Sequence, residues 1–517
     1  MAVKTIKFLL LCGLVIFFAG CKVGSDEIDE DLSTYEKPII RRIDPGGVIY
    51  NRMGFVFNAF SDSFPNESYS LYFNKRRIGS CEPNYWHYHL WWDIPADFLS
   101  QLTTTTGTGD FTIDVRITPI QTDISDSFDR YAEYISDVRQ ITIKRDSSTS
   151  FTSPAPVNDL WENSTDPVLR RDSRGYLYLA WRELLNGVYQ AFFCYSVDEG
   201  ANWSQVLNIS RSTKEVTKVD MEIDDDGDFY MVWSEQENYF SEVYFSRSLD
   251  NGATWWLPRR LSIANENSRN PVIDVDSWGK IYVAWTNYLP EGNVPDYNTL
   301  WLASSSDRGN FWQTRLMANS DTVSGEPAIQ AGENGNIYII CGALGPGGVY
   351  TFYSNDYGNN WHINLVNQSL DLNNGQKTSL RIGTGETLFL AWNTEYTGGH
   401  NFSNWIQFMS GANNGAAWDV RQYLDYICNT NGTKAAMTVN GSQVNALMHS
   451  GKAPFLLRSP DGGETWSYPE FIPGTTSSLG SVPLDMVTAD TGRIYLVFIQ
   501  KNTVSNQSGT IYFTRSD

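Results

Sequence analysis

The sequence predicts an all-β protein in which a small β-sandwich precedes a seven-bladed β-propeller. Three observations support this prediction. One eight-residue turn motif recurs through the C-terminal part of the chain, and short strand-like segments accompany each copy. A separate N-terminal group of segments alternates apolar and polar residues at strand spacing. Both parts of the chain are therefore expected to consist of antiparallel strands.

The recurring motif reads S-x-D-x-G-x-x-W. Its copies occupy residues 196–203, 248–255, 305–312, 354–361 and 459–466, and an altered copy at 411–418 has Asn413 in place of the Asp. Ser and Asp side chains can hydrogen-bond neighbouring backbone amides, Gly permits a positive φ, and Trp adds a large apolar plate. The motif therefore predicts a tight turn between two strands, with its acids in structural roles.

The motif resembles the Asp box, or BNR repeat, of the sialidase-like β-propellers. Its Trp residues are about 50 residues apart, which is typical of propeller blades. Seven inner hairpins are expected, at residues 166–181, 219–233, 270–285, 326–341, 378–392, 434–448 and 483–498. Because the chain ends before a seventh outer strand, residues near 151–158 are expected to pair with residues near 509–515 and close the ring.

The N-terminus has the features of an export signal. Lys4 and Lys7 precede an apolar run at residues 8–18, which is too short to span a bilayer as a helix. Residues 1–20 resemble the signal peptide of a bacterial lipoprotein, which implies lipidation of Cys21; an ordinary secretory signal is the alternative. Residues 21–36 form an acidic tether that resembles the export signal of Bacteroides-type surface lipoproteins. An outer-membrane lipoprotein exposed on the cell surface is therefore expected.

Residues 37–146 are expected to form the β-sandwich. About seven short strands occur in roughly 110 residues, the content of an immunoglobulin-like sandwich. The segment also resembles TIG domains. An aromatic cluster at residues 85–92 is interpreted as strand residues packed on the sandwich or the propeller, with ligand binding as the alternative. Residues 147–517 then form the propeller.

The composition excludes several classes of function. A formal net charge of −21 disfavours nucleic acid, because binding it depends on neutralising phosphates. Cys81, Cys194, Cys341 and Cys428 are far apart, with no C-x-x-C pair to indicate zinc or redox chemistry. The acidic run at 224–228 lacks the bidentate Glu of an EF-hand loop. No cofactor and no metal are expected, and the oligomeric state stays open.

The propeller face opposite the Asp boxes is the expected binding face, because the resembling families hold their ligands there. Its loops join the second and third strands of each blade and connect successive blades. A bowl lined by carboxylates, tyrosines and a few cations suits a hydroxyl-rich ligand such as a glycan. The ligand-binding candidates are Arg182, Glu183, Tyr239, Asn287, His400, His449 and Lys501.

Catalytic candidates lie on the same face. Sialidases carry an Arg-Ile-Pro element whose Arg begins a triad that clamps the substrate carboxylate, but Thr165-Asp166-Pro167 stands at the matching position of the first inner strand. The resemblance offers Arg269, followed by Asn270-Pro271, as a substitute. It further implies Asp296 as the acid/base, and a nucleophile pair drawn from Tyr288 or Tyr396 with Glu235 or Glu395.

The sequence thus indicates a lipid-anchored surface protein that binds or processes carbohydrate and contacts the membrane through its anchor only. Two alternatives stay open. One is an active exo-sialidase or related glycoside hydrolase, which is disfavoured because the standard clamp is absent. The other is a non-enzymatic scaffold that binds protein, since a fold does not determine function.

Overall fold

The structure is a computed structural model. It describes residues 39–49, 52–60, 69–73, 76–81, 88–93, 111–118, 139–143, 151–157, 163–237, 240–263, 266–289, 297–318, 323–342, 349–365, 378–396, 403–412, 414–415, 417–419, 422–424, 436–449, 454–464, 466–467, 470–472, 481–501 and 509–516. The predicted signal peptide, the lipidation site Cys21 and the acidic tether lie outside these residues. No helix among the described residues is long and apolar enough to cross a membrane.

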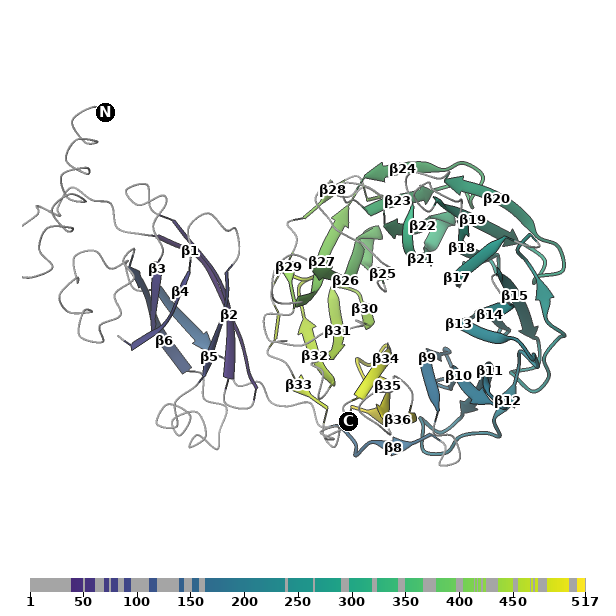
Figure 1. Ribbon diagram of the computed structural model, residues 1–517, viewed down its shortest axis with the longest axis horizontal. Helices are drawn as coiled ribbons and strands as arrows, with labels where there is room; N and C mark the ends of the chain where they lie inside the picture. Colours follow the sequence, from purple (N-terminus) through teal and green to yellow (C-terminus); the bar gives the residue numbers. More distant parts are fainter. Residues whose placement is uncertain are drawn as a thin grey trace, which may run out of the picture. The chain divides into compact units, whose positions relative to one another are not determined.

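Two sheets precede the propeller (Figure 1). One has three strands, in the order β1 (Ile39–Ile49), β2 (Arg52–Phe60) and β5 (Tyr88–Asp93). The other has four, in the order β4 (Arg76–Cys81), β3 (Tyr69–Phe73), β6 (Phe111–Thr118) and β7 (Arg139–Ile143). The N-terminal segment is therefore all-β, as predicted, and part of its aromatic cluster lies in β5. Its assignment as an immunoglobulin-like sandwich stays a prediction.

The remaining strands form a ring of four-stranded antiparallel units (Figure 1), and we number these blades 1 to 7 along the described part of the chain. Blades 1 to 3 comprise β9 (Ser164–Arg171), β10 (Leu177–Leu185), β11 (Val188–Ser196) and β12 (Leu207–Asn208); β13 (Glu215–Ile223), β14 (Phe229–Glu237), β15 (Phe240–Ser248) and β16 (Arg259–Arg260); β17 (Asn267–Val275), β18 (Ile281–Leu289), β19 (Tyr297–Ser305) and β20 (Gln313–Ala318). In each blade the first strand lies innermost, around the centre of the ring.

Blades 4 to 7 repeat this plan. They comprise β21 (Ser324–Ala331), β22 (Ile337–Gly342), β23 (Val349–Ser354) and β24 (His362–Leu365); β25 (Thr378–Ile382), β26 (Leu388–Tyr396), β27 (Ser403–Ala412) and β28 (Ala417–Trp418), with β29 (Gln422–Tyr423) also paired to β27; β30 (Ala436–Asn440), β31 (Gln443–His449), β32 (Pro454–Ser459) and β33 (Glu470–Phe471); and β34 (Ser481–Thr488), β35 (Ile494–Lys501), β36 (Gly509–Arg515) and β8 (Ala155–Pro156).

The ring closes where the start of the propeller chain meets its end. Strand β8 pairs with β36, in the register Tyr512↔Pro156 and Phe513↔Ala155. The amide of Val157 donates to the carbonyl oxygen of Ile511 at 2.9 Å, and an isolated bridge joins Phe151 to Ser516. The predicted closure is confirmed. Because β36 also pairs with β9, blades 7 and 1 share one continuous sheet.

The Asp boxes with an intact Ser and Asp form the predicted turn, as the copy in blade 2 shows. The Ser248 hydroxyl accepts a hydrogen bond from the amide of Gly252 at 2.9 Å and donates to Asp250 at 2.7 Å. Asp250 in turn accepts from the amide of Thr254 at 2.8 Å, and Gly252 has φ 85°. These bonds satisfy the buried polar groups of the turn without any ligand, so the box acids are structural.

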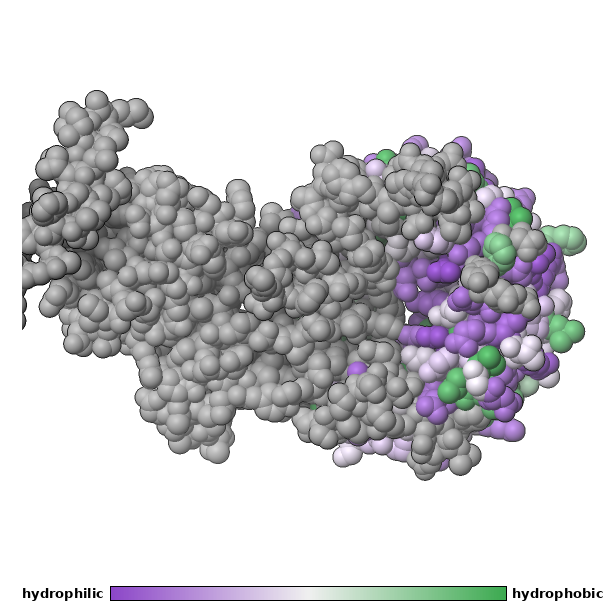
Figure 2. Space-filling model, viewed as in Figure 1, coloured by the Kyte–Doolittle hydropathy of each residue, from purple (hydrophilic) through white to green (hydrophobic). Residues whose placement is uncertain are grey.

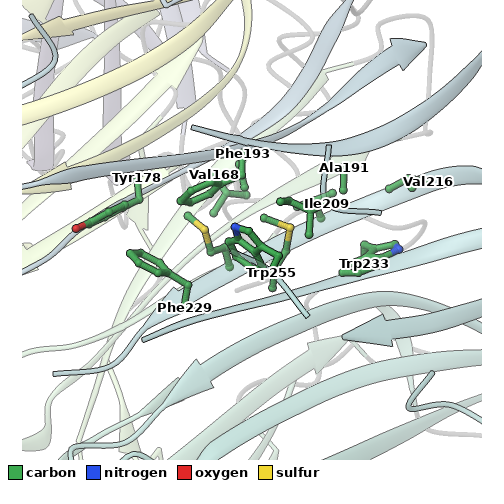
Figure 3. Close-up of a cluster of buried hydrophobic side chains, with 13 residues drawn as sticks. Val168, Tyr178, Ala191, Phe193, Ile209, Val216, Phe229, Trp233 and Trp255 are labelled. Carbon is green, nitrogen blue, oxygen red and sulfur yellow. The ribbon is translucent and has the colours of Figure 1, made fainter. Parts of the chain in front are cut away.

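The boxes also join neighbouring blades. Trp255 of the blade 2 box is buried and meets Phe193 of blade 1 edge-on, with ring centroids 5.1 Å apart (Figure 3). The pairs Trp203–Phe513, Trp312–Phe245 and Trp466–Phe408 repeat this contact between other blades. Such aromatic pairs add to the stabilisation that apolar burial alone provides. The hydrophobic core therefore lies between blades as a series of clusters.

Candidate functional site: a charged channel through the propeller

A cavity of about 490 Å³ runs along the centre of the ring and is lined by the inner strands. Hydrophilic side chains gather around the central opening on the face seen in Figure 2. On β13, alternate residues Lys218, Asp220 and Glu222 line the cavity, as the strand pleat requires. The volume lies within the range of small-ligand sites, although such sites usually have apolar walls. Here most of the polar lining is charged.

Bulges distort the inner strands where they enter the ring, at the end we call the upper mouth. The pairing register shifts in five blades, and the shifts involve Asp166-Pro167, Thr217, Asn270-Pro271, residues 325–327 and Pro483. Asp166 and Asn270 adopt positive φ there, 50° and 55°. Proline lacks the amide that a regular ladder needs, so it is accommodated at a bulge. Bulges of this kind re-aim side chains and are frequent beside active sites.

Side chains of opposite charge form ion pairs near the bulges at the upper mouth. Lys218 of blade 2 donates to the carboxylate of Glu326 in blade 4 at 2.9 Å. Burial alone would lower the pKa of Lys218, but the carboxylates of Glu326 and Asp166 offset this effect and raise it. Arg182 donates to Asp166 through Nε at 3.0 Å and also through a short Nη2 contact. Two carboxylate–cation pairs thus lie at the mouth.

Deeper in the channel, the guanidinium of Arg170 joins three blades. It pairs with Asp220 at 3.2 Å and Glu222 at 2.8 Å in blade 2, and with Asp485 at 3.3 Å in blade 7. Burial alone would lower the pKa of Arg170, but these carboxylates offset it, so the group stays charged. Burial is also the first reason why the pKa of Arg381 is lowered, and the charge of Arg170 adds to it.

Asp274 lies in the same layer and is held by blade 4. It accepts hydrogen bonds from the side-chain amide of Gln330 and from the backbone amide of Ala331, each at 2.7 Å. Burial and the nearby charge of Glu222 raise the pKa of Asp274 to about 8. Asp274 is therefore protonated at neutral pH. Loss of this proton at alkaline pH would add a negative charge to the channel.

Three predicted ligand or catalytic residues occupy one repeated position, two residues after a buried Trp on the second strand. Glu235 accepts from the indole of Trp233 at 2.8 Å and from the Ser212 hydroxyl at 2.9 Å. Asn287 accepts from Trp285 at 2.9 Å and from Ser268 at 2.7 Å. Glu183 accepts from the amide of Asn163 at 3.1 Å and from the Ser164 hydroxyl.

All three side chains are at least 95% removed from solvent. Burial raises the pKa of Glu183 and of Glu235. Ser164 and Ser268, the partners of Glu183 and Asn287, belong to the first strand of their blades, so these contacts join the first strand to the second. Contact between any of them and a ligand stays a prediction.

Arg269 and Tyr288 do come together, at the mouth end of blade 3. The guanidinium of Arg269 lies 5.5 Å from the ring centroid of Tyr288, and its Nε donates to Asn267 at 2.9 Å. Lys501 lies half-buried at the end of β35. Glu395, Tyr396 and His449 lie in strands that the structure describes, but it does not describe their side chains. Asp296, Tyr239 and His400 lie outside the described residues.

Sequence reasoning missed the residues that line the channel, namely Arg170, Lys218, Asp220, Glu222, Asp274, Glu326, Arg381 and Asp485. A signal was present. Charged residues alternate with apolar ones in the inner strand Lys218-Val219-Asp220-Met221-Glu222, although that strand is expected to be buried. Among the described residues, no group of three or more His, Cys, Asp or Glu side chains is arranged to hold a metal ion.

Comparisons with known proteins agree with the repeat. Residues 145–339 match the family of the BNR repeat-like domain, which confirms the resemblance drawn from the Asp boxes for this part of the chain. A search of curated proteins found no match.

Several solved structures resemble the chain. The NanB sialidase of Streptococcus pneumoniae does so at 12% identity over 90% of this chain and 83% of its own, with TM-score 0.41. The Trypanosoma rangeli sialidase does so at 12% identity over 70% of this chain and 57% of its own, with TM-score 0.41. The GH93 α-L-arabinofuranosidase of Fusarium graminearum does so at 11% identity over 59% and 95%, with TM-score 0.42. These likenesses are distant and identify no activity.

Proposed function

We propose that this protein binds carbohydrate at the upper mouth of its channel. The observation that carries the proposal is the pair of carboxylate–cation contacts at the bulges, with Asp166 beside Arg182 and Lys218 beside Glu326. Sugar hydroxyls donate and accept hydrogen bonds at once, so a surface that offers carboxylates and cations side by side can satisfy both functions. Hydrogen bonds that involve a charged partner are also stronger than neutral ones.

The support for hydrolysis is weaker than the support for binding. A sialidase-like reaction would need Arg269 to clamp a carboxylate, yet its Nε already donates to Asn267. Glu235, a candidate partner of the nucleophile, is buried and bonded to Trp233 and Ser212. The Nε bond leaves the terminal nitrogens of the guanidinium unaddressed, so the main obstacle to catalysis is that Glu235 would have to exchange its partners. A protein-binding scaffold would not require a charged mouth. A glycan array distinguishes this alternative from carbohydrate binding.

The test is a glycan array probed with the soluble chain from residue 22. Isosteric changes at the mouth, Asp166→Asn and Glu326→Gln, should abolish or weaken each signal, whereas Asp250→Asn in an Asp box on the opposite face serves as the control. Thermal melting must show that the mouth variants are folded, because each change removes one partner of a half-buried ion pair. An array without signals, or signals unaffected by both mouth changes, would contradict the proposal.

A fluorogenic sialoside assay on the same samples tests the enzymatic alternative. Turnover that Arg269→Ala and Asp296→Asn both abolish, with unchanged melting, would establish hydrolysis in place of binding alone.

We also propose that Cys21 carries a lipid and that the protein is displayed on the outer membrane. The support is the sequence of residues 1–36. Cys21→Ala should release the protein from the membrane fraction, and protease treatment of intact cells should cleave the unchanged protein. Retention of the variant on the membrane would contradict the lipid anchor.

A further inference from the structure

The outer rim between blades 2 and 3 carries an aromatic side chain in a fixed position. Trp256 is 52% exposed, and the guanidinium carbon of Arg247 lies 3.5 Å from its ring centroid. Arg247 is itself buried, at 3% exposure. The backbone of Trp256 is also held, because its amide donates to the carbonyl oxygen of Arg247 at 2.9 Å and its carbonyl accepts from Ser246 at 2.8 Å. One face of the indole is thus covered and oriented by a cation.

The same arginine links this plate to blade 3. Arg247 donates to the Asn310 side chain at 3.0 Å, and Arg259 donates to the Asn310 carbonyl oxygen at 2.6 Å. Phe311 follows Asn310 and is 79% exposed. Trp256 and Phe311 therefore belong to one continuous stretch of surface that crosses the boundary between two blades.

Exposed arginines repeat along this rim. Arg259 of β16 contacts the Asp box of blade 3, and Arg315 of β20 contacts the box of blade 4 through the carbonyl oxygens of Gly358 and Asn359, at 3.0 and 3.3 Å. Both arginines bind backbone carbonyls, and within the described residues neither forms an ion pair with a carboxylate. In a chain with net charge −21, these two exposed cations recur at equivalent places in successive blades.

We propose that this rim strip, formed by Trp256, Arg259, Phe311 and Arg315, is a second binding site and that its ligand is an acidic polysaccharide. The open face of Trp256 would stack on a sugar ring, and the carboxylate or sulfate groups would pair with the two arginines. A polymer fits better than a single sugar, because the cations recur from blade to blade. An extended peptide fits less well at Trp256, where the adjacent edge strand β16 has only two residues.

The strip is separate from the upper mouth. The Asp boxes that Arg259 and Arg315 contact connect the third and fourth strands, at the end of the blade opposite the bulges. The two proposals can therefore fail independently.

Binding of the full chain to immobilised polygalacturonate and to heparin tests the strip. Polygalacturonate offers carboxylates alone, and heparin offers sulfate groups as well. Dextran is the uncharged control, and poly-glutamate is the polyanion without sugar rings. At least one acidic polysaccharide should bind, and Trp256→Ala should weaken it about tenfold. The double change Arg259→Gln/Arg315→Gln should weaken it similarly and flatten its salt dependence. Trp278→Ala, which removes another exposed Trp (75%), should change nothing.

Thermal melting controls for folding, because Trp256 covers Arg247 and Trp256→Ala could destabilise the blade. The double change at the exposed arginines tests the strip without disturbing this contact. Asp166→Asn at the mouth should leave this binding intact, which separates the strip from the proposed glycan site. Equal binding of poly-glutamate would instead indicate an acidic protein partner and overturn the proposal. So would the absence of binding to both acidic polysaccharides, or binding that neither strip variant reduces.

Discussion

Trp255 of one blade and Phe193 of the preceding blade meet edge-on, with their ring planes at 65°. Trp255 is 7% exposed and packs in the cluster that also contains Phe229 and Val216 (Figure 3). Trp255→Ala is expected to lower the free energy of unfolding by about 3 to 5 kcal/mol. Chemical denaturation measures this change. Trp255→Phe should lose less, and a Trp255→Ala protein with unchanged stability but lost ligand binding would mean that Trp255 contacts the ligand instead.

Gly252 and Gly187 separate packing from backbone strain. Both have a positive φ, 85° and 86°, but a Cβ at Gly252 would lie 2.7 Å from the Phe193 ring, whereas a Cβ at Gly187 would meet nothing within 4 Å. Gly187→Ala should cost about 1 kcal/mol, the penalty for a left-handed conformation. Gly252→Ala should cost about 1 to 3 kcal/mol more, because it overpacks the blade boundary. Equal losses in the two variants would show that the close approach of blade to blade is unimportant.

The closing strand should decide whether the ring melts as one unit. A chain that begins at residue 147 retains β8, whereas one that begins at residue 159 exposes the edge of β36. Calorimetry should show a single sharp transition for the longer chain and a broader transition at lower temperature for the shorter one. Identical melting of the two chains would contradict the role given to this seam.

Asp274 should make the propeller sensitive to alkaline pH. Its folded-state pKa of about 8 lies above the ordinary Asp value, so the folded chain holds a proton that the unfolded chain releases. Stability from this group is fully present below the ordinary Asp pKa of about 4, is lost progressively as pH rises to about 8, and does not change further above that. Asp274→Asn cannot lose a proton, so the gap in melting temperature between variant and parent should shift in favour of the variant from pH 5 to pH 9. A gap that does not change with pH would remove Asp274 as the source.

The sequence repeat made the fold predictable, but it did not reveal most of the residues that line the channel. The spacing of Trp residues revealed the blades, and the missing outer strand revealed the closure, because both follow from patterns local to each blade. Channel residues such as Arg170 find their partners in blades far along the chain, at Asp220 and Asp485. Such pairs depend on how the blades are arranged around the axis. Sequence spacing alone could not supply that arrangement.

The upper-face candidates illustrate the same limit. Glu235 and Asn287 are polar residues next to loops, which in sequence is typical of ligand contacts. The structure buries both and gives each of them two partners, the indole two residues earlier and a serine hydroxyl. A comparison of the repeats would have detected this W-x-E/N position as a feature of the blade.

The seam between β8 and β36 also determines when this protein can fold. The hydroxyls of Thr152 and Thr514 lie 3.1 Å apart although 362 positions separate them in the chain. Closing so long a loop is entropically unfavourable, and its contacts form after the local ones. During synthesis, residues 151–157 emerge before the strands of the seven blades and have no partner until β36 has left the ribosome. The nascent propeller must therefore exist for most of its translation as an open arc of blades, and closure of the ring is the last step in its assembly.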